Sequence, residues 1–374
     1  MFDLVDIALI FLIAIIAIPR LFSVSERTPA TNTSTVPIMI NRRGGARIPS
    51  RRIPIAPPPD RLGDQPPPTP VSFYEPRPED IVEVKDILSK ARNIPPELVD
   101  MILDHAEYWA CSATVIDYSN HPQHKITILG SRPAQSQFLL RTEPLGLTRW
   151  SRSSQDLWRI ESAPKPLKKE YTESDFQDLV DGPFSTLEHP FRKIVFEIVS
   201  CDQGWSSEPE HHGQYEGSWT WFDVGLERFD KENECVTECP DHLGSEELKG
   251  TPTIPTCAIR PIWPEIGHTQ DNPEAMVYKH GLLPNEDRLI QRNKHAISTF
   301  QTHHVEWSWD DDIDPESPLA TQSLKEAGRG TGTGNGEFLR TLKLGDMVTV
   351  WGHARFPGWT NNIQRVEVKV YWAF

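Results

Sequence analysis

The stretch Val366-Glu-Val-Lys-Val-Tyr-Trp372 decides the fold class of this chain. Its apolar residues occupy every second position, and charged or amphipathic side chains stand between them. Successive side chains of a strand point to opposite faces, so this spacing predicts a strand with one buried and one wetter face. Such a strand belongs to a sheet that packs against another layer.

Further segments carry strand-like patterns, and helical periods are scarce beyond residue 112. The predicted strands are Lys125–Leu129, Lys193–Ser200, Ser218–Leu226, Ala296–Phe300, His304–Ser308 and Met347–His353. The loops between them are long and rich in Pro, Gly, Asn and Asp. We therefore expect a mainly β fold over residues 113–374, an antiparallel two-sheet sandwich of jelly-roll type.

Two amphipathic helices are predicted before the strands. Residues 79–92 carry apolar side chains at helical spacing, and Asn93-Ile-Pro-Pro96 ends that pattern. A second helix then begins at Pro96 and places Leu98, Met101 and Ile102 on one face. We expect a short helical hairpin over residues 77–112.

The N-terminal 22 residues form a candidate transmembrane anchor. Residues 7–18 are an unbroken apolar run, and residues 4–22 reach about the 17–25 residues that span a bilayer. Arginines follow this run and acids precede it, which predicts a single pass with the C-terminal domain in the cytoplasm. The alternative is a buried N-terminal helix or a mistaken start, in a soluble cytoplasmic protein.

A proline- and arginine-rich linker is predicted over residues 23–76. This segment has almost no large apolar side chains, so it cannot bury enough surface to offset its ordering entropy. Arg51-Arg-Ile-Pro54-Ile-Ala-Pro57 has the spacing of an SH3 ligand. A disordered spacer is the simpler interpretation.

Charge and cysteine content narrow the classes of partner. The net charge is −15, although residues 20–59 hold seven arginines and one acid. An acidic body argues against a nucleic-acid partner, which needs a basic surface. Five cysteines in 374 residues do not form a disulfide framework, and they favour a reducing compartment.

The most unusual local composition lies between Cys201 and Phe222. It reads CDQGWSSEPEHHGQYEGSWTWF and combines aromatic rings with carboxylates, amides and glycines. Rings with polar neighbours suit a polar ligand such as a glycan, or a protein partner. The candidate ligand-binding residues are Asp202, Gln203, Trp205, Glu216, Trp219 and Trp221. The alternative is that these rings fill the sandwich core.

Motifs for catalysis, metals and cofactors are weak. Cys235, Cys239 and His242 are zinc-ligand types without a C-x-x-C knuckle, and Asp310–Asp314 lacks the glycine of an EF-hand loop. Gly328–Gly336 matches no nucleotide-binding loop. We therefore expect no catalytic residues, no metal and no cofactor. A hydrolase without a recognisable motif stays open as an alternative.

Several blocks resemble an uncharacterised fungal protein family, some of whose members adjoin ankyrin-type regions. The blocks are PPELVDMILDHAEYW from Pro95, DQGW from Asp202, GSWTWF from Gly217, WSWD from Trp307, GDMVTVW from Gly345 and FPGW from Phe356. Ile94–Leu103 also resembles the first helix of an F-box, which would imply a ubiquitin-ligase adaptor. Together the patterns indicate a non-catalytic binding module on a membrane-tethered protein.

Overall fold

The computed structural model describes residues 75–131, 133–150, 155–181, 184–185, 187–233, 254–269 and 272–373. Residues 75–374 form one compact unit, which is mainly β. Sheet A contains β1 (Ala110–Asp117), β2 (Ile126–Leu129), β4 (Phe191–Cys201), β10 (Gln301–Ser308) and β12 (Thr360–Trp372). Sheet B contains β3 (Ser136–Arg141), β5 (Thr220–Phe229), β6 (Ile259–Trp263), β9 (Leu289–Arg292) and β11 (Met347–Ala354). A small third sheet pairs β7 (Ile266–His268) with β8 (Met276–Tyr278).

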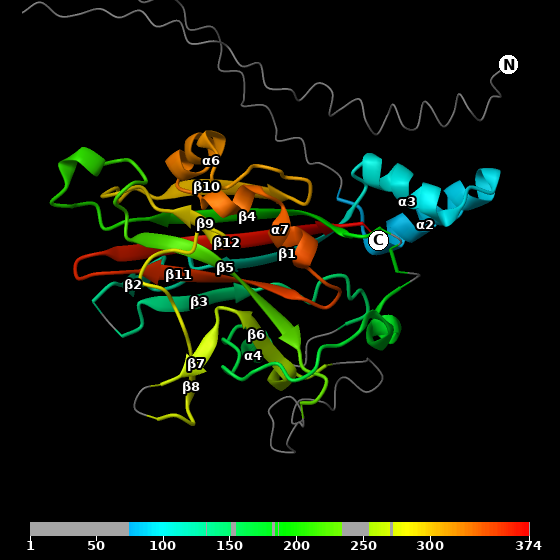
Figure 1. Ribbon diagram of the computed structural model, residues 1–374, viewed down its shortest axis with the longest axis horizontal. Coiled ribbons are helices and arrows are strands. Elements are labelled where there is room, and N and C mark those ends of the chain that lie inside the picture. The colour runs from blue at the N-terminus through cyan, green and yellow to red at the C-terminus, as the bar shows by residue number, and fades with distance from the viewer. Residues whose placement is uncertain are drawn as a thin grey trace, which may run out of the picture. The chain divides into compact units, whose positions relative to one another are not determined.

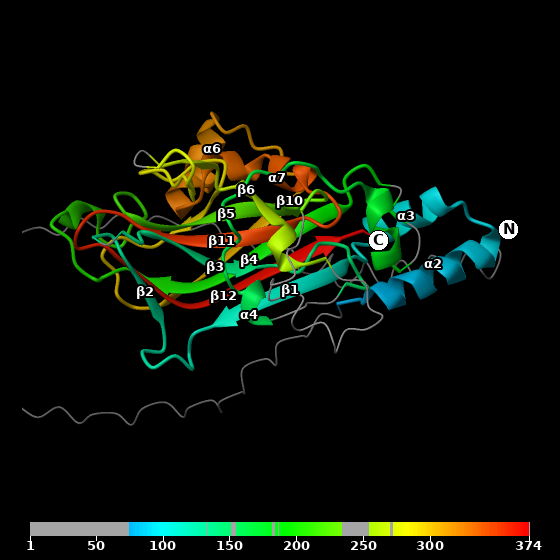
Figure 2. The same ribbon diagram turned by 90° about the horizontal axis from the view of Figure 1, so that it is seen from below.

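Every strand pair in the two large sheets is antiparallel. Sheet A runs in the order β1-β12-β4-β10, with β2 also on β12, and sheet B runs β3-β11-β5-β6, with β9 also on β5. Figure 2 shows these strands as two layers, which is the expected sandwich arrangement. The prediction of a mainly β, two-sheet fold is thereby confirmed.

The core lies between the two sheets and follows from alternation along the strands. The apolar positions of β12 predicted to share a face, Val366, Val368, Val370 and Trp372, are all buried. From sheet B, Val348 and Val350 on β11 are also fully buried. A Cβ atom at Gly352 would lie 2.7 Å from Ile128, so this glycine allows the two sheets to approach closely.

A hydrogen-bonded group of fully buried polar side chains joins the two sheets at one end of the core. Ser200 donates to Asn293 Oδ1 (2.7 Å), and Asn293 Nδ2 donates to Thr220 Oγ1 and Asn361 Oδ1 (both 3.0 Å). Asn361 Nδ2 donates to the carbonyl oxygen of His353 (3.1 Å). All five residues are buried. Buried polar groups are tolerated when they are paired, and this network pairs them across the sandwich.

The helices are short apart from two near the N-terminal end of the described chain. Figure 1 places α2 (Pro78–Arg92) and α3 (Pro96–His105) beyond one end of the strands, beside the C-terminus. The other helices among the described residues are α4 (Gln155–Trp158), α6 (Pro318–Ser323) and α7 (Glu337–Thr341), with 3-10 turns at Glu173–Leu179, Pro209–His211, Thr256–Ala258, Lys325–Ala327 and Thr331–Gly334. Arg192 of β4 pairs with Asp104 of α3 through two bonds of 2.7 and 2.8 Å, which fixes the hairpin against sheet A.

One predicted strand is wrong and several observed strands were not predicted. Residues 296–300 form no strand: Ala296 lies in a turn with a left-handed φ of 57°, its N–H donates to Asp202, and residues 297–300 are irregular. The apolar residues there mimic a strand, but the turn at Ala296 and its bond to Asp202 set a different backbone path. The unpredicted strands are β1, β3, β6, β7, β8 and β9. Strand β1 begins at Ala110, inside the range 77–112 predicted for the hairpin.

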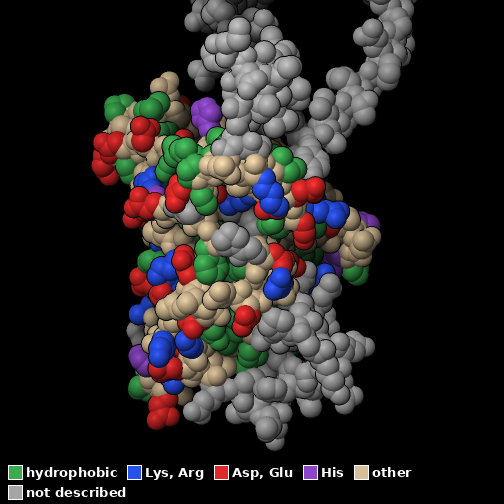
Figure 3. Space-filling view, turned by 90° about the vertical axis from the view of Figure 1, so that its right-hand side faces the viewer, with side chains coloured by type: hydrophobic (Ala, Val, Ile, Leu, Met, Phe, Trp, Pro, Cys, Tyr) green, Lys and Arg blue, Asp and Glu red, His purple; other side chains and the backbone are tan. Residues whose placement is uncertain are grey.

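Two predicted segments lie outside the described residues, namely the anchor over residues 1–22 and the linker up to residue 74. Within the described part of the chain, every helix is too short or too polar to span a bilayer. The face seen in Figure 3 carries acidic and basic side chains interspersed with apolar ones, and neither sign gathers into a single patch.

The buried amide network should contribute strongly to stability. We expect Asn293→Ala to lower the free energy of unfolding by about 2–3 kcal/mol, because it removes one buried hydrogen-bond partner from each of Ser200, Thr220 and Asn361. Gln123→Ala, an exposed amide, is the matched control and should change it by less than about 0.5 kcal/mol. Urea denaturation measures both. Equal stability of the two variants would show that the network is dispensable.

Candidate functional site

The predicted site residues Asp202 and Gln203 hold loops together. Asp202 is fully buried, and its carboxylate accepts from the N–H groups of Gln203 (2.6 Å) and Ala296 (3.0 Å). Burial raises the pKa of Asp202 to about 7, although both hydrogen bonds act in the other direction. Gln203 Oε1 accepts from the N–H of Thr360 (3.1 Å). These polar groups therefore close the ends of β4 and β12.

Two of the predicted tryptophans border a shallow cleft. Gln203, Trp205 and Trp219 line a space of about 130 Å³ together with Pro357 and Trp359. Trp205 is 63% exposed, the ring of Trp219 meets Phe356 edge-on at 4.6 Å, and Glu216 is exposed in the loop that precedes β5. The cleft is smaller than the roughly 300–1,000 Å³ of typical ligand pockets.

Trp221 lies apart from this cleft, on the outer face of sheet B that points away from sheet A. It is 1% exposed, its ring stacks on His353 at 5.0 Å, and its Nε1 donates to Asp223 Oδ2 (3.0 Å). Trp221, the last tryptophan of the Trp-rich motif, therefore lies beside a second and larger site, which the sequence did not predict.

That site is a cavity of about 390 Å³ on the outer face of sheet B. Its lining comes from β5, β11 and the segments that flank β7 and β8. The residues are Asp223, Val224, Trp263, Pro264, Glu265, Lys279, His280, Gly281, Leu283, Asn285, Arg288 and His353. The volume is that of a small-molecule site.

The segment 278–288, here called the roof segment, passes over β11. The ring of Tyr278 lies 5.0 Å from that of Trp351, and the ring of His280 lies 4.9 Å from Trp351 and 5.4 Å from His353. Gly225 makes room beneath, because a Cβ atom there would lie 2.7 Å from the carbonyl oxygen of Trp263 and 3.0 Å from Trp351 Nε1. A bare backbone at this position of β5 thus allows the aromatic floor to form.

A chain of hydrogen bonds orients the ring of His353. Arg355 Nη2 donates to Ser136 Oγ (3.0 Å), and Ser136 Oγ lies 2.9 Å from His353 Nδ1. The direction of the second bond follows the tautomer of the imidazole, because a hydroxyl group can both donate and accept. The other ring nitrogen, Nε2, lies 3.3 Å from Asp223 Oδ2.

Both histidines of the cavity are neutral near pH 7. Burial lowers the pKa of His280 to about 4 and holds the pKa of His353 well below its usual value, and the charge of Arg355 acts in the same direction on both. The imidazole of His280 therefore offers hydrogen-bonding atoms to the cavity, and neither ring adds positive charge to it.

The carboxyl group of Asp223 is only partly hydrogen-bonded. Its side chain is 19% exposed, yet its Oδ1 atom is buried and has no hydrogen-bond partner in the described part of the chain. Burial raises its pKa to about 7, against the opposing effects of the Trp221 N–H and the charge of Arg355. The exposed part of this carboxyl group lies on the cavity wall, where it can accept from a ligand donor, or donate when protonated.

The group Ser136, His353 and Asp223 contains the residue types of a hydrolytic triad, but its contacts favour a positioning role. Ser136 is not among the residues that line the cavity, and its Oγ already accepts from Arg355. The contact between His353 Nε2 and Asp223 is close but is not aligned as a hydrogen bond. We therefore interpret Ser136 as the residue that orients His353.

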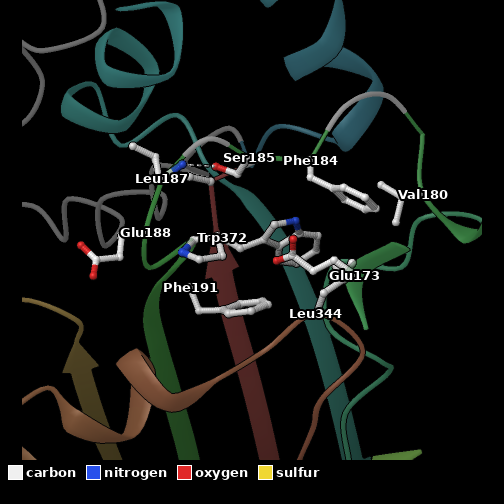
Figure 4. Close-up of a pocket in the computed structure, with 12 residues that line it drawn as sticks. Glu173, Val180, Phe184, Ser185, Leu187, Glu188, Phe191, Leu344 and Trp372 are labelled. Carbon is white, nitrogen blue, oxygen red and sulfur yellow. Dashed lines mark hydrogen bonds between the residues drawn. The ribbon is translucent and has the colours of Figure 1, made fainter. Parts of the chain in front are cut away.

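A third pocket, of about 80 Å³, lies near the C-terminal end of β12 and is shown in Figure 4. The rings of Phe191 and Trp372 lie at its centre in that view, with Phe184 and Leu344 beside them. The space is mostly apolar and holds only a few atoms. It is too small to be the main ligand site.

Among the described residues, no group of three or more His, Cys, Asp or Glu side chains is arranged to hold a metal ion. The predicted zinc-type residues Cys235, Cys239 and His242 lie outside those residues. Comparisons of the chain with family models, with curated proteins and with solved structures find no match. The fungal and F-box resemblances therefore stay predictions.

Two tryptophans of one motif should differ sharply in their contribution to stability. We expect Trp221→Ala to lower the free energy of unfolding by about 3–5 kcal/mol, because it removes a buried ring that supports His353. Trp205→Ala removes a mostly exposed ring and should cost less than about 1 kcal/mol. Chemical denaturation of both variants tests this, and a large cost at Trp205 would contradict the described burial.

The raised pKa of Asp223 predicts a pH dependence of stability. The folded protein keeps this proton up to about pH 7, whereas the unfolded chain releases it near pH 4. Stability from this group is therefore full below pH 4 and falls as pH rises to 7, by up to about 1.4 kcal/mol per pH unit.

Asp223→Asn removes this contribution. Asp202, whose pKa is also raised by burial, is present in both proteins, so its effect cancels in the comparison. Unfolding free energies of wild type and variant, measured by urea denaturation at pH 5 and pH 8, should therefore diverge with pH. A constant difference between the two proteins would place the pKa of Asp223 near its ordinary value.

Proposed function

We propose that this chain is a ligand-binding β-sandwich module, and that its ligand is a small polar molecule held in the cavity on the outer face of sheet B. The observation that carries this proposal is a cavity of about 390 Å³ whose wall holds the partly exposed Asp223 carboxyl group. Burial raises the pKa of this carboxyl group to about 7, because its charged form is poorly solvated. A ligand hydroxyl or amine would donate a hydrogen bond to the part of the carboxyl group that faces the cavity.

The surroundings of Asp223 support binding over chemistry. His353 is oriented by Ser136, and Ser136 is in turn held by Arg355. Arg355 also donates to the carbonyl oxygens of Gln135 and Gly281, so this part of the wall is fixed before any ligand arrives. A preorganised wall loses little entropy on binding, which is the property of a specific site.

The polar cavity also suits the class of ligand that the Trp-rich composition suggested. Trp263 supplies an aromatic ring, and the neutral His280 supplies hydrogen-bonding nitrogens. Aromatic rings beside convergent polar groups are the usual recognition chemistry of hydroxylated ligands. In this proposal the membrane-tethered arrangement predicted for residues 1–76 serves to display the module.

A ligand screen with two matched variants tests the location of the site. The full chain is screened against polar small molecules and monosaccharides by thermal shift, and hits are quantified by calorimetry. A ligand at 100 times its Kd should stabilise the fold by about 2.7 kcal/mol. We expect Asp223→Asn to weaken each hit at least tenfold and Trp205→Ala to leave it within twofold.

The reverse pattern would reject the proposal. Hits that survive Asp223→Asn and disappear with Trp205→Ala would place the ligand in the cleft beside Trp219 instead. Far-UV circular dichroism of both variants serves as the folding control.

A further inference from the structure

The cavity has a positive wall that the polar-ligand proposal does not use. The guanidinium of Arg288 lies 4.3 Å from the ring centroid of Trp263 and 5.5 Å from that of Phe338. No hydrogen bond or ion pair of this guanidinium is found within the described part of the chain. Burial lowers its pKa, and the charges of Asp287 and Glu337 oppose this effect only in part.

The contacts of Arg288 leave its N–H groups available to a ligand. Stacking on an indole holds the plane of a guanidinium but does not satisfy its five donors. Such a group pairs bidentately with a carboxylate or a phosphate, and the pairing strengthens where water is partly excluded. Lys279, which lines the same cavity and has an exposed side chain, adds a second positive charge.

The cavity therefore has two poles of opposite chemistry. Arg288 and Lys279 attract an anion, whereas the partly exposed Asp223 carboxyl group accepts from a hydrogen-bond donor. Glu265 is the other carboxylate of the lining, and the two histidines are uncharged. A neutral ligand would leave Arg288 unpaired, and a cation would face two positive groups.

We infer that the ligand is a small hydroxylated anion of the sugar-acid or sugar-phosphate class. Its carboxylate or phosphate binds Arg288, and one of its hydroxyl groups donates to the exposed part of the Asp223 carboxyl group. This inference rests on the proposed function, because it assigns a ligand class to the same cavity. Carboxylate and phosphate share the chemistry that Arg288 recognises, so the two sources are separated by experiment.

Four probes and the full chain test the ligand class. Glucuronate, glucose 6-phosphate, glucose and inorganic phosphate are titrated by calorimetry at one fixed ionic strength. Glucuronate and glucose share a ring and differ in the anionic group, so their comparison isolates the contribution of Arg288. We expect at least one anionic sugar to bind ten times more tightly than glucose and than inorganic phosphate, and the better of the two identifies the anion.

Variants of Arg288 complete the test. Arg288→Gln should weaken the anionic sugar at least tenfold and leave glucose within twofold, while Arg288→Lys, which keeps the charge, should give an intermediate loss. Arg149→Gln is the matched control, because Arg149 is an exposed arginine that does not line the cavity. Circular dichroism and melting temperature verify that each variant folds, and Arg288→Lys replaces Arg288→Gln if the latter does not.

The failures of the two proposals are distinguishable. Glucose that binds as tightly as glucuronate and glucose 6-phosphate, or anionic binding that is unchanged by Arg288→Gln, overturns the anionic ligand class. Binding that is sensitive to Asp223→Asn would still uphold the polar-ligand site in that case. Absence of binding by all four probes also overturns the ligand class.

Discussion

The amide pair of Asn293 and Asn361 is the constraint on which the architecture of the site depends. It sits fully buried between the sheets and joins β4 and β12 to β5. Asn361 also donates to the carbonyl oxygen of His353, so the same pair fixes the end of β11. An interior polar network is costly unless every member is satisfied. Here the network ties the end of β11, at His353, to β12 of the other sheet, while pairing with β3 and β5 determines which side chains of β11 face the cavity.

The fold was predictable where one strand carried its own alternation. Val366–Trp372 specifies its buried face without any knowledge of its neighbours, and the structure agrees. The prediction failed for residues 296–300, because an apolar run does not reveal that Ala296 adopts a left-handed backbone held by Asp202. Strand β3, Ser136–Arg141, was missed because much of its character comes from pairing with β11, a partner about 210 residues away.

The site was less predictable than the fold, for a physical reason. The Trp-rich motif could be recognised because its residues are adjacent in sequence. Its polar members Asp202 and Gln203, however, hold loops together and do not form a ligand site. Asp223, Arg288 and His353 lie on β5, on the roof segment and on β11. They come together only because β5 pairs with β11 and the roof segment packs over both. Trp221 belongs both to the motif and to the surroundings of the cavity, since it is the last tryptophan of the motif and its ring stacks on His353. Asp223, two residues after Trp221, was the residue closest to the motif that could have indicated the cavity.

Arg355 gives the cavity a property that no single contact shows. One guanidinium donates both to the carbonyl oxygen of Gly281 in the roof segment and to Ser136. A displacement of the roof segment would therefore disturb the bond that holds the Ser136 hydroxyl group beside His353. The position of the roof segment and the orientation of this histidine are thus coupled through one side chain, and such coupling is reciprocal. A ligand contact that holds His353 in place also favours the observed position of the roof segment.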